Sequence, residues 1–509
     1  MDSLFGGDMS LLSGIFLIVA LLLAFSFEFV NGFHDTANAV ATVIYTNALP
    51  AWFAVIWSGC WNLIGVLLSA GTVAFGILAL LPVELVLNVG SGAGFAMVFS
   101  LLISAIIWNV GTWYFGLPAS SSHTLIGSIV GVGLANSVMS AGHTFGDGVN
   151  WGKVQDTLTA LLVSPVIGFV CSALLLLLFK AGSAALLRWS AGKIHSEELY
   201  AEPDKAKPPT PWIRALLILT CTGVSFAHGS NDGQKGMGLV LLILIGVIPG
   251  TYALNLGLDS NAVAGIFAQS QTASTTLAKL EPAGAPAVSA ADAATELNAF
   301  LKSSSKVTPQ TLPAVAAENT LITTALTGKS TIGDVPKAER KDLRSEIYLV
   351  SNAIAKLKKS KAIADPDAMK SLDTYHKALD KTTNFIPLWV KVAVAFALGL
   401  GTMIGWKRIV VTVGERIGKT HLTYAQGASA EIVAYATIQA ADNFGVPVST
   451  THILSSGVAG TMAANKSGLQ MATLRSIVLA WVLTLPVTVF LGSFLFAFGL
   501  RLVSSFGVH

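Results

Sequence analysis

Two aspartates, Asp35 and Asp232, lie inside long runs of apolar residues. A charge at the centre of a membrane-spanning helix costs roughly 3 kcal/mol on insertion scales, so such residues usually mark ion or proton pathways. Each aspartate follows a glycine by three residues, and glycine allows a helix to break and to expose backbone groups to a cavity. The oxygens of Asp35 and Asn38, with freed carbonyls, suit a hard cation such as Na⁺ or Mg²⁺. Asp35 and Asp232 are therefore candidate cation, proton or metal ligands, and helix capping is the structural alternative.

Lys235 stands three residues after Asp232, at the place where the first segment carries Asn38. Its ammonium could replace a bound cation, neutralise Asp232 or contact an anionic substrate. A lysine that reaches out to the membrane surface is the alternative. Because residues 229–238 are flanked by apolar residues on both sides, the functional interpretation is favoured.

Two runs of hydroxyl residues each follow a proline and are predicted to begin a helix. The free N–H groups and the positive dipole end of a helix bind anions, and hydroxyls add neutral donors. Two such ends could converge on one phosphate or sulfate. The candidate anion ligands are Ser120, Ser121, Ser122, Ser449, Thr450 and Thr451.

Several other ionisable residues lie in or near these motifs. Histidine can relay protons near neutral pH, although a single histidine is more often a hydrogen-bonding support. The two glutamates are either coupling groups or structural partners of polar neighbours. These candidates are His34, His123, His228, His452, Glu28 and Glu431. The sequence has no Walker, GxSxG or HExxH motif, so an ATP-driven pump or a familiar hydrolase has no support.

The composition is that of a membrane protein. Of 509 residues, 53% are hydrophobic and 12% charged, and the mean hydropathy is +0.67, whereas soluble domains carry about 25% charged residues. A net charge of +3 without a basic block argues against nucleic acid as a partner. The three cysteines lack the spacing of a disulfide framework or zinc site.

The chain divides into two apolar blocks around a polar insert. Between Asp259 and Lys381 lie 15 of the 31 Lys and Arg residues and 13 of the 28 Asp and Glu residues. The insert is either a small helical domain or partly disordered. We predict an N-terminal transmembrane repeat (1–187), a basic linker (188–212), the first part of a C-terminal repeat (213–255), the insert (256–384) and the rest of that repeat (385–509).

Ten segments are apolar enough to be candidate spans. They are 10–45, 51–81, 94–115, 120–140, 157–187, 213–255, 386–405, 425–444, 446–465 and 472–500. Lys and Arg are concentrated in the loops 188–214, 406–424 and 466–475. The positive-inside rule places these loops in the cytoplasm, and hence both termini and the insert outside. Residues 116–140 and 445–465 could span fully or re-enter.

The sequence also contains an internal repeat. Residues 116–123 reappear as 445–452, and residues 29–38 pair more weakly with 226–235. Five passes per half would invert the second copy, which is the plan of many secondary transporters. The predicted fold is an all-α polytopic membrane protein of two inverted-topology repeats, with broken helices or hairpins, about 10–12 spans and a polar insert.

These motifs resemble the inorganic phosphate transporter (PiT) family, and more closely its bacterial low-affinity branch. The resemblance rests on GFHDTANAVAT at 32–42, WNVGTWYFGLPASSSHTLIG at 108–127, HGSNDGQKGMG at 228–238 and GVPVSTTHILSS at 445–456. It implies a multi-pass inner-membrane secondary transporter, often dimeric, that moves phosphate with a cation gradient and needs no cofactor. By position, it implies that Asp35, Asn38 and Asp232 form the cation and phosphate centre and that both hydroxyl runs bind phosphate.

The chain departs from the family pattern at two places. His34 stands where the motif often has Asn, and Gln234-Lys235 replaces its closing Ala-Asn. The departure at Lys235 favours proton coupling, as in the bacterial branch, which is also linked to neutral complexes of phosphate with Mg²⁺ or another divalent metal. A sodium-coupled phosphate symporter and a sulfate symporter are the alternatives. An anion channel and a membrane phosphohydrolase are rivals of other classes.

Overall fold

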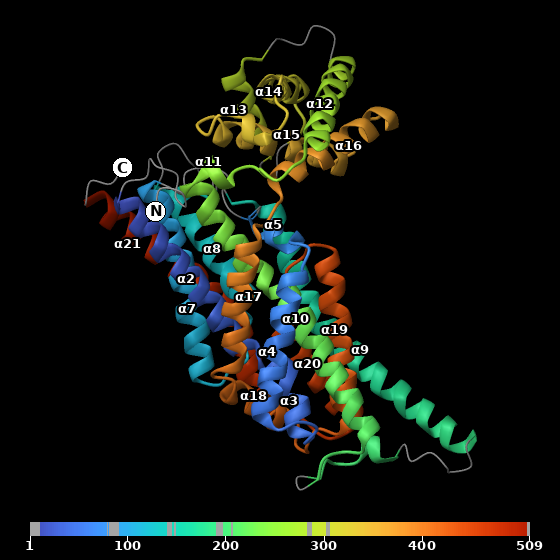
Figure 1. Ribbon diagram of the computed structural model, residues 1–509. Coiled ribbons are helices and arrows are strands. Elements are labelled where there is room, and N and C mark those ends of the chain that lie inside the picture. The colour runs from blue at the N-terminus through green and yellow to red at the C-terminus, as the bar shows by residue number, and fades with distance from the viewer. Residues whose placement is uncertain are drawn as a thin grey trace.

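The computed structural model describes residues 11–78, 80, 91–139, 145–146, 149–189, 197–204, 207–281, 288–301 and 306–505. Every regular element within these residues is a helix, as the sequence predicted. Figure 1 shows a long bundle with a separate group of helices, α12 to α16, at one end.

The bundle contains most of the apolar helices. They are α2 (Leu11–Asp35), α3 (Ala37–Tyr45), α4 (Ala51–Leu68), α5 (Thr72–Leu78), α7 (Gly92–Tyr114), α8 (Ser121–Met139), α9 (Trp151–Trp189), α10 (Pro211–Val247), α11 (Pro249–Tyr252), α17 (Leu388–Met403), α18 (Lys407–Glu415), α19 (Tyr424–Asn443), α20 (Thr450–Ala464) and α21 (Met471–Ser505). The start of α2 and the end of α21 lie at the insert end, and the connection from α9 to α10 lies at the opposite end (Figure 1).

The insert forms a five-helix domain with its own apolar core. Its helices are α12 (Ser260–Leu280), α13 (Ala290–Leu301), α14 (Thr311–Leu326), α15 (Arg340–Lys359) and α16 (Pro366–Thr383). Leu297, Ile347 and Leu372 are completely buried among them. Of the two alternatives for this segment, its described residues therefore adopt the helical domain.

Fewer helices qualify as spans than the ten that we predicted. Seven described helices are long and apolar enough to cross a membrane, or eight if the pair α16 and α17, bent by 70°, counts as one span. Helix α20 has only 15 residues, and a span needs about 20. Helix α19 carries the buried acids Glu431 and Asp442. Both helices are covered by protein over much of their length, so neither needs a continuous apolar surface.

The breaks in the helices differ in part from those that we expected. Helix α10 runs unbroken through residues 229–238, where we predicted an interruption. Its glycines serve close packing instead. A Cβ atom on Gly229 would lie 2.1 Å from the Asn62 carbonyl oxygen, and one on Gly236 would lie 2.2 Å from Glu28 Cγ. In the first segment, only Thr36 separates α2 from α3.

Two hairpins provide the main interruptions. The α7–α8 turn contains Gly116 (φ +68°), and the α19–α20 turn contains Gly445 (φ +65°), a backbone region that strongly favours glycine. Helix α8 lies toward the insert end of the bundle and α20 toward the opposite end (Figure 1). The repeated motifs 116–123 and 445–452 therefore form two corresponding hairpins.

Each half of the chain packs against the other. Helix α17 packs on α2, α4 on α10, α21 on α8 and α9 on α20. If α2 corresponds to α10, α4 to α17, α8 to α20 and α9 to α21, each pair has its counterpart in this set. This exchange of partners is the packing that the predicted repeat requires.

The close α4–α10 contact gives a stability prediction. We expect Gly229→Ala to lower the free energy of unfolding by about 1–3 kcal/mol, because the new methyl group would overpack against backbone. Gly111→Ala on α7 is the control, since its added Cβ would meet nothing within 4 Å. The thermal unfolding midpoint of the detergent-solubilised protein measures both. Equal midpoints for the two variants would contradict the packing role of Gly229.

Candidate functional site

Asp35 lies at the centre of the bundle, at the C-terminal end of α2, and is 2% exposed. Its Oδ1 accepts a hydrogen bond from the Thr451 hydroxyl at 2.6 Å and lies 3.1 Å from His34 Nδ1. Its Oδ2 accepts from Ser121 at 3.3 Å and from Thr450 at 3.5 Å. Both hairpins therefore reach the same carboxylate.

Asp232 lies beside Asp35, although it comes from the middle of α10. Its Oδ2 forms an ion pair with Lys235 Nζ at 2.7 Å and accepts from Ser121 at 3.4 Å. His228 Nε2 stands between the two carboxylates, 3.5 Å from Asp232 Oδ2 and 3.7 Å from Asp35 Oδ2. The two predicted aspartates thus lie close together. Lys235 contacts Asp232, and His228 lies near both carboxylates.

The hydroxyl runs divide into residues that contact the aspartates and residues that support the hairpins. Ser121, Thr450 and Thr451 point to the aspartates. Ser120 and Ser449 instead accept hydrogen bonds from the backbone N–H groups of His123 and His452, as helix N-caps do. Ser122 donates to the carbonyl of Val448 in the opposite hairpin at 2.8 Å. Three of the six predicted anion ligands, Ser120, Ser122 and Ser449, therefore make hydrogen bonds to the backbone of the hairpins.

The two histidines of the hairpins lie against each other. The rings of His123 and His452 are 4.7 Å apart, and His452 stacks on Trp481 at 4.0 Å. Neither ring makes a hydrogen bond or ion pair with Asp35 or Asp232 among the described contacts. They pack the two helix N-termini together, whereas His34 and His228 contact the carboxylates.

Two polar residues that the sequence analysis missed hold the central histidines. Thr112 on α7 lies 3.2 Å from His34 Nε2, and Asn62 Oδ1 on α4 lies 2.6 Å from His228 Nδ1. Both are buried in otherwise apolar helices, which is the signal that could have identified them. They fix the orientation of each ring toward the aspartates.

The remaining candidates are the two glutamates and Asn38. Glu28 is fully buried, and neither of its oxygens has a hydrogen-bond partner among the described residues. It interacts electrostatically with Asp232, Lys235 and His228. Glu431 accepts a hydrogen bond from Thr220, which ties α19 to α10. The side chain of Asn38 lies outside the described residues.

A second polar layer, also missed by the sequence analysis, lies on the insert side of the aspartates. Asp442 accepts hydrogen bonds from Ser230 at 2.5 Å and from Gln234. Next to this layer, a cavity of about 410 Å³ lies between the α19–α20 turn, α5 and the insert. Arg344 and Tyr348 of α15 line this cavity. The polar contacts therefore continue from the central site toward the insert end.

The charge balance of the centre limits what it can bind. Asp35, His228 and Asp232 offer ligand atoms within 4.8 Å of one another, a set that suits protons or a hard or borderline cation. One ammonium, from Lys235, opposes the two aspartates. Because like charges repel strongly in a buried site, added positive charge at the aspartates or at the adjoining His34 and His228 would favour the entry of an oxyanion.

Comparisons with known proteins agree with this arrangement. Residues 31–492 match the sequence pattern of the phosphate transporter family. The low-affinity inorganic phosphate transporter PitA of Escherichia coli K12 is 42% identical over 98% of this chain and 99% of its own. PitB of the same organism is 40% identical over 99% of this chain and 100% of its own.

A solved structure described as a sodium-dependent phosphate transporter has a similar fold. It covers 95% of this chain and 98% of its own, with a TM-score of 0.51 and 18% identity. The likeness at that identity concerns the fold alone. The sequence matches, in contrast, extend over both apolar blocks at high identity. The chain is therefore a multi-pass inner-membrane protein that belongs to the phosphate transporter family.

Proposed function

We propose that this protein is a secondary active transporter, not an enzyme, that takes up inorganic phosphate together with a cation. The observation that carries the proposal is the convergence of two hydroxyl-bearing helix N-termini on two buried aspartates. Ser121 of one hairpin contacts both Asp35 and Asp232, and Thr451 of the other contacts Asp35. Helix N-termini and hydroxyls supply the donors that a tetrahedral oxyanion needs.

The aspartates support symport rather than passive flux. Phosphate carries at least one negative charge near neutral pH, and Asp35 and Asp232 would repel it in a site of low dielectric. A proton or a metal ion bound at these carboxylates removes that repulsion. Anion and cation binding therefore depend on each other, which is the physical requirement of coupled transport.

We favour protons as the coupling ion, with a neutral divalent metal–phosphate complex as a further form of the substrate. Lys235 already places a fixed positive charge 2.7 Å from Asp232, in the position where the family pattern has Asn. Its presence opposes a second, symmetric Na⁺ site. Asp35, Asp232 and His228 are the residues that would bind the metal of such a complex. A sodium-coupled symporter and a sulfate symporter remain the alternatives.

Uptake of radiolabelled phosphate into proteoliposomes tests this proposal. We expect accumulation when a proton gradient is imposed alone, and none with a sodium gradient alone. Accumulation that requires sodium would show that the coupling ion is Na⁺ and not a proton. If sulfate but not phosphate accumulates, the substrate assignment is wrong. Flux that only equilibrates the anion would indicate a channel.

The hydroxyl ligands give a separate prediction for affinity. We expect Ser121→Ala combined with Thr450→Ala to raise the KM for phosphate about tenfold, because each neutral hydrogen bond contributes about 0.5–1.5 kcal/mol. Ser104→Ala is the matched control, since Ser104 bonds Ser128 within the α7–α8 hairpin at 2.7 Å. Initial uptake rates over a range of phosphate concentrations provide KM. An unchanged KM in the double variant would exclude direct ligation.

The orientation and assembly are also proposed. The basic loops 188–214, 406–424 and 466–475 favour a cytoplasmic location for their end of the bundle, with the insert outside. The boundaries 1–187, 188–212, 213–255, 256–384 and 385–509 remain our division of the chain. A homodimer follows from the family resemblance alone and stays a prediction.

A further inference from the structure

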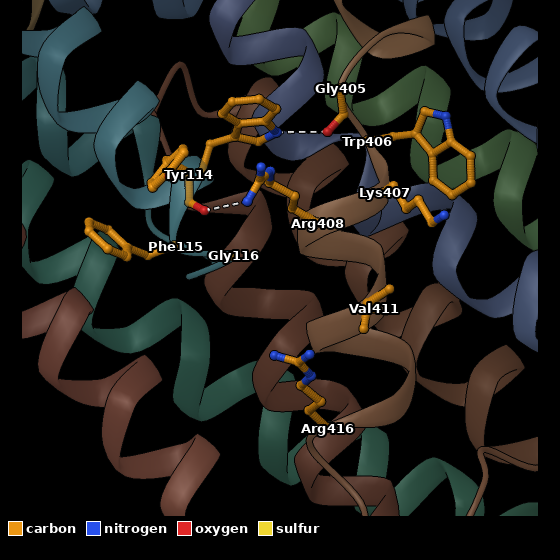
Figure 2. Close-up of a pocket in the computed structure, with 10 residues that line it drawn as sticks. Tyr114, Phe115, Gly116, Gly405, Trp406, Lys407, Arg408, Val411 and Arg416 are labelled. Atoms are coloured by element: carbon orange, nitrogen blue, oxygen red, sulfur yellow. Dashed lines mark hydrogen bonds between the residues drawn. The ribbon is translucent and has the colours of Figure 1, made fainter.

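A second cavity lies at the end of the bundle opposite the insert. It has a volume of about 610 Å³ and is formed where α7 ends and α18 begins (Figure 2). This place corresponds to the insert-side cavity in the other half, because Phe115-Gly116 here matches Phe444-Gly445 there. The central aspartates do not line it, so it is a separate site.

The charged residues that line this cavity are all basic. Lys407, Arg408 and Arg416 contribute to it, and none of its lining residues is acidic. No ion pair among the described residues includes any of these three cations. The acidic neighbour in sequence, Glu415, interacts with Tyr45 and is not part of the lining. The lining of the cavity therefore carries positive charge that no ion pair among the described residues neutralises.

One of the three cations is held in a fixed position. The Arg408 guanidinium donates to the Tyr114 carbonyl at 2.8 Å and lies 4.9 Å and 5.3 Å from the ring centres of Tyr114 and Trp113. Trp113 in turn donates to the Gly405 carbonyl at 2.7 Å, as Figure 2 shows. Two aromatic rings and one hydrogen bond thus orient Arg408, and its other N–H groups stay available to an anion.

The rim of the cavity is aromatic and exposed. Tyr114 is 58% and Phe115 is 73% exposed, and both lie at the end of a helix that is apolar enough to span the membrane. Aromatic residues at such a position lie at the level of the lipid head groups. Basic side chains at the same level attract anionic lipids. The combination provides a place for a phosphate and, beside it, for the acyl chains attached to it.

We propose that this cavity binds the head group of an anionic phospholipid, with its phosphate on Arg408, Lys407 and Arg416 and its acyl chains along Tyr114 and Phe115. The same basic groups could bind free phosphate. The exposed aromatic rim favours the lipid, because a free phosphate has no apolar part to cover it.

A bound lipid would join three elements that surround the central site. The cavity wall includes the end of α7, the first turn of the α7–α8 hairpin and α18, and Thr412 of α18 donates to the Gly116 carbonyl at 2.7 Å. Trp113 packs against Phe33 at 5.0 Å, two residues before Asp35. A lipid there would stabilise this end of the bundle as a unit.

Thermal unfolding and native mass spectrometry of the full chain in detergent test the site. We expect phosphatidylglycerol to raise the unfolding midpoint and to remain bound, and phosphatidylcholine to do neither. The triple variant Lys407→Gln, Arg408→Gln, Arg416→Gln should bind phosphatidylglycerol at least about tenfold more weakly. The triple variant Lys419→Gln, Lys466→Gln, Arg475→Gln is the charge-matched control, because it removes three exposed cations from the basic loops that do not line the cavity.

Three outcomes would overturn the proposal. The first is equal retention of phosphatidylglycerol by the lining variant and the wild type. The second is an equal loss in both triple variants, which would show attraction to overall charge only. In the third, inorganic phosphate raises the midpoint through the lining cations and phosphatidylglycerol does not, which would assign the cavity to the free anion.

Discussion

Replacement of Asp35 by asparagine is expected to abolish phosphate uptake and to leave the protein inserted and folded. Asparagine has nearly the same shape and can still accept the hydrogen bond of Thr451, which is 2.6 Å long in the wild type. It cannot carry a proton in exchange or balance a cation. Because a hydrogen bond to a charged group contributes about 1.5–3 kcal/mol, and the coupling charge itself is lost, we expect uptake to fall at least about 100-fold.

Uptake into proteoliposomes, normalised to the inserted protein, measures this effect. Asp156→Asn is the matched control, because Asp156 has a carboxylate that is 59% exposed at the start of α9. The control should transport at the wild-type rate. Wild-type accumulation by the Asp35→Asn variant would remove Asp35 from the coupling site. A variant that fails to elute as a folded protein in detergent would show instead that the carboxylate is needed for folding.

The buried pair of Lys235 and Asp232 gives the second large effect. We expect Lys235→Met alone and Asp232→Asn alone to destabilise the protein by about 3–5 kcal/mol, because each leaves one buried charge without its partner. The double variant should regain most of the stability, since neither member of the pair then leaves its partner's charge behind. None of the three variants should accumulate phosphate, because transport requires the charges themselves.

Unfolding midpoints and uptake assays, measured on the same preparations, separate the two roles of this pair. Lys358→Met in the insert is the control, because Lys358 also lies 2.7 Å from an aspartate, Asp373, but is 52% exposed. Such exposed pairs contribute about 0–1 kcal/mol. Wild-type transport by the stable double variant would show that Lys235 and Asp232 are a structural pair only.

Much of the central site could be predicted from residue type and repetition. Carboxylates are rare in apolar helices, and the repeated proline–hydroxyl motif shows that two distant segments have the same local structure. These two signals identified Asp35, Asp232, Ser121 and Thr451 as candidates, and the family resemblance assigned them to one site. Asn62 and Thr112 were missed because their partners lie 166 and 78 residues away along the chain, and nothing in their own neighbourhood indicates which ring they contact.

The glycines and the number of spans show a different limit. A glycine in a helix can permit a break or a close approach, and the choice depends on the element that packs against it. Gly229 faces the backbone of α4, so α10 continues. Hydropathy likewise measures the apolar length of a segment and not whether lipid or protein surrounds it. The short helix α20 and the acidic helix α19 were included among the candidate spans for that reason.

The exchanged helix pairs distribute the aspartates and the two hydroxyl runs among three groups of helices. Helices α2, α4, α10 and α17 contact one another and form a central block that carries both aspartates. Helix α8 is packed on α21, and α20 on α9, each through a glycine that faces backbone: Gly131 toward Val489 and Gly460 toward Phe169. These form two arms, and each carries one hydroxyl run.

This division restricts how the site can open. Separation within an arm or within the block would break tight glycine contacts. Separation between an arm and the block would break side-chain hydrogen bonds such as that from Thr451 to Asp35, together with the packing of α7 on α2 and of α19 on α10. The arms enter from opposite ends of the bundle, so we expect that release of one arm would expose the aspartates to one side and release of the other arm to the opposite side. A substrate held by both arms and the block would lock all three together, and its loss of contact with one arm would select the side from which it leaves.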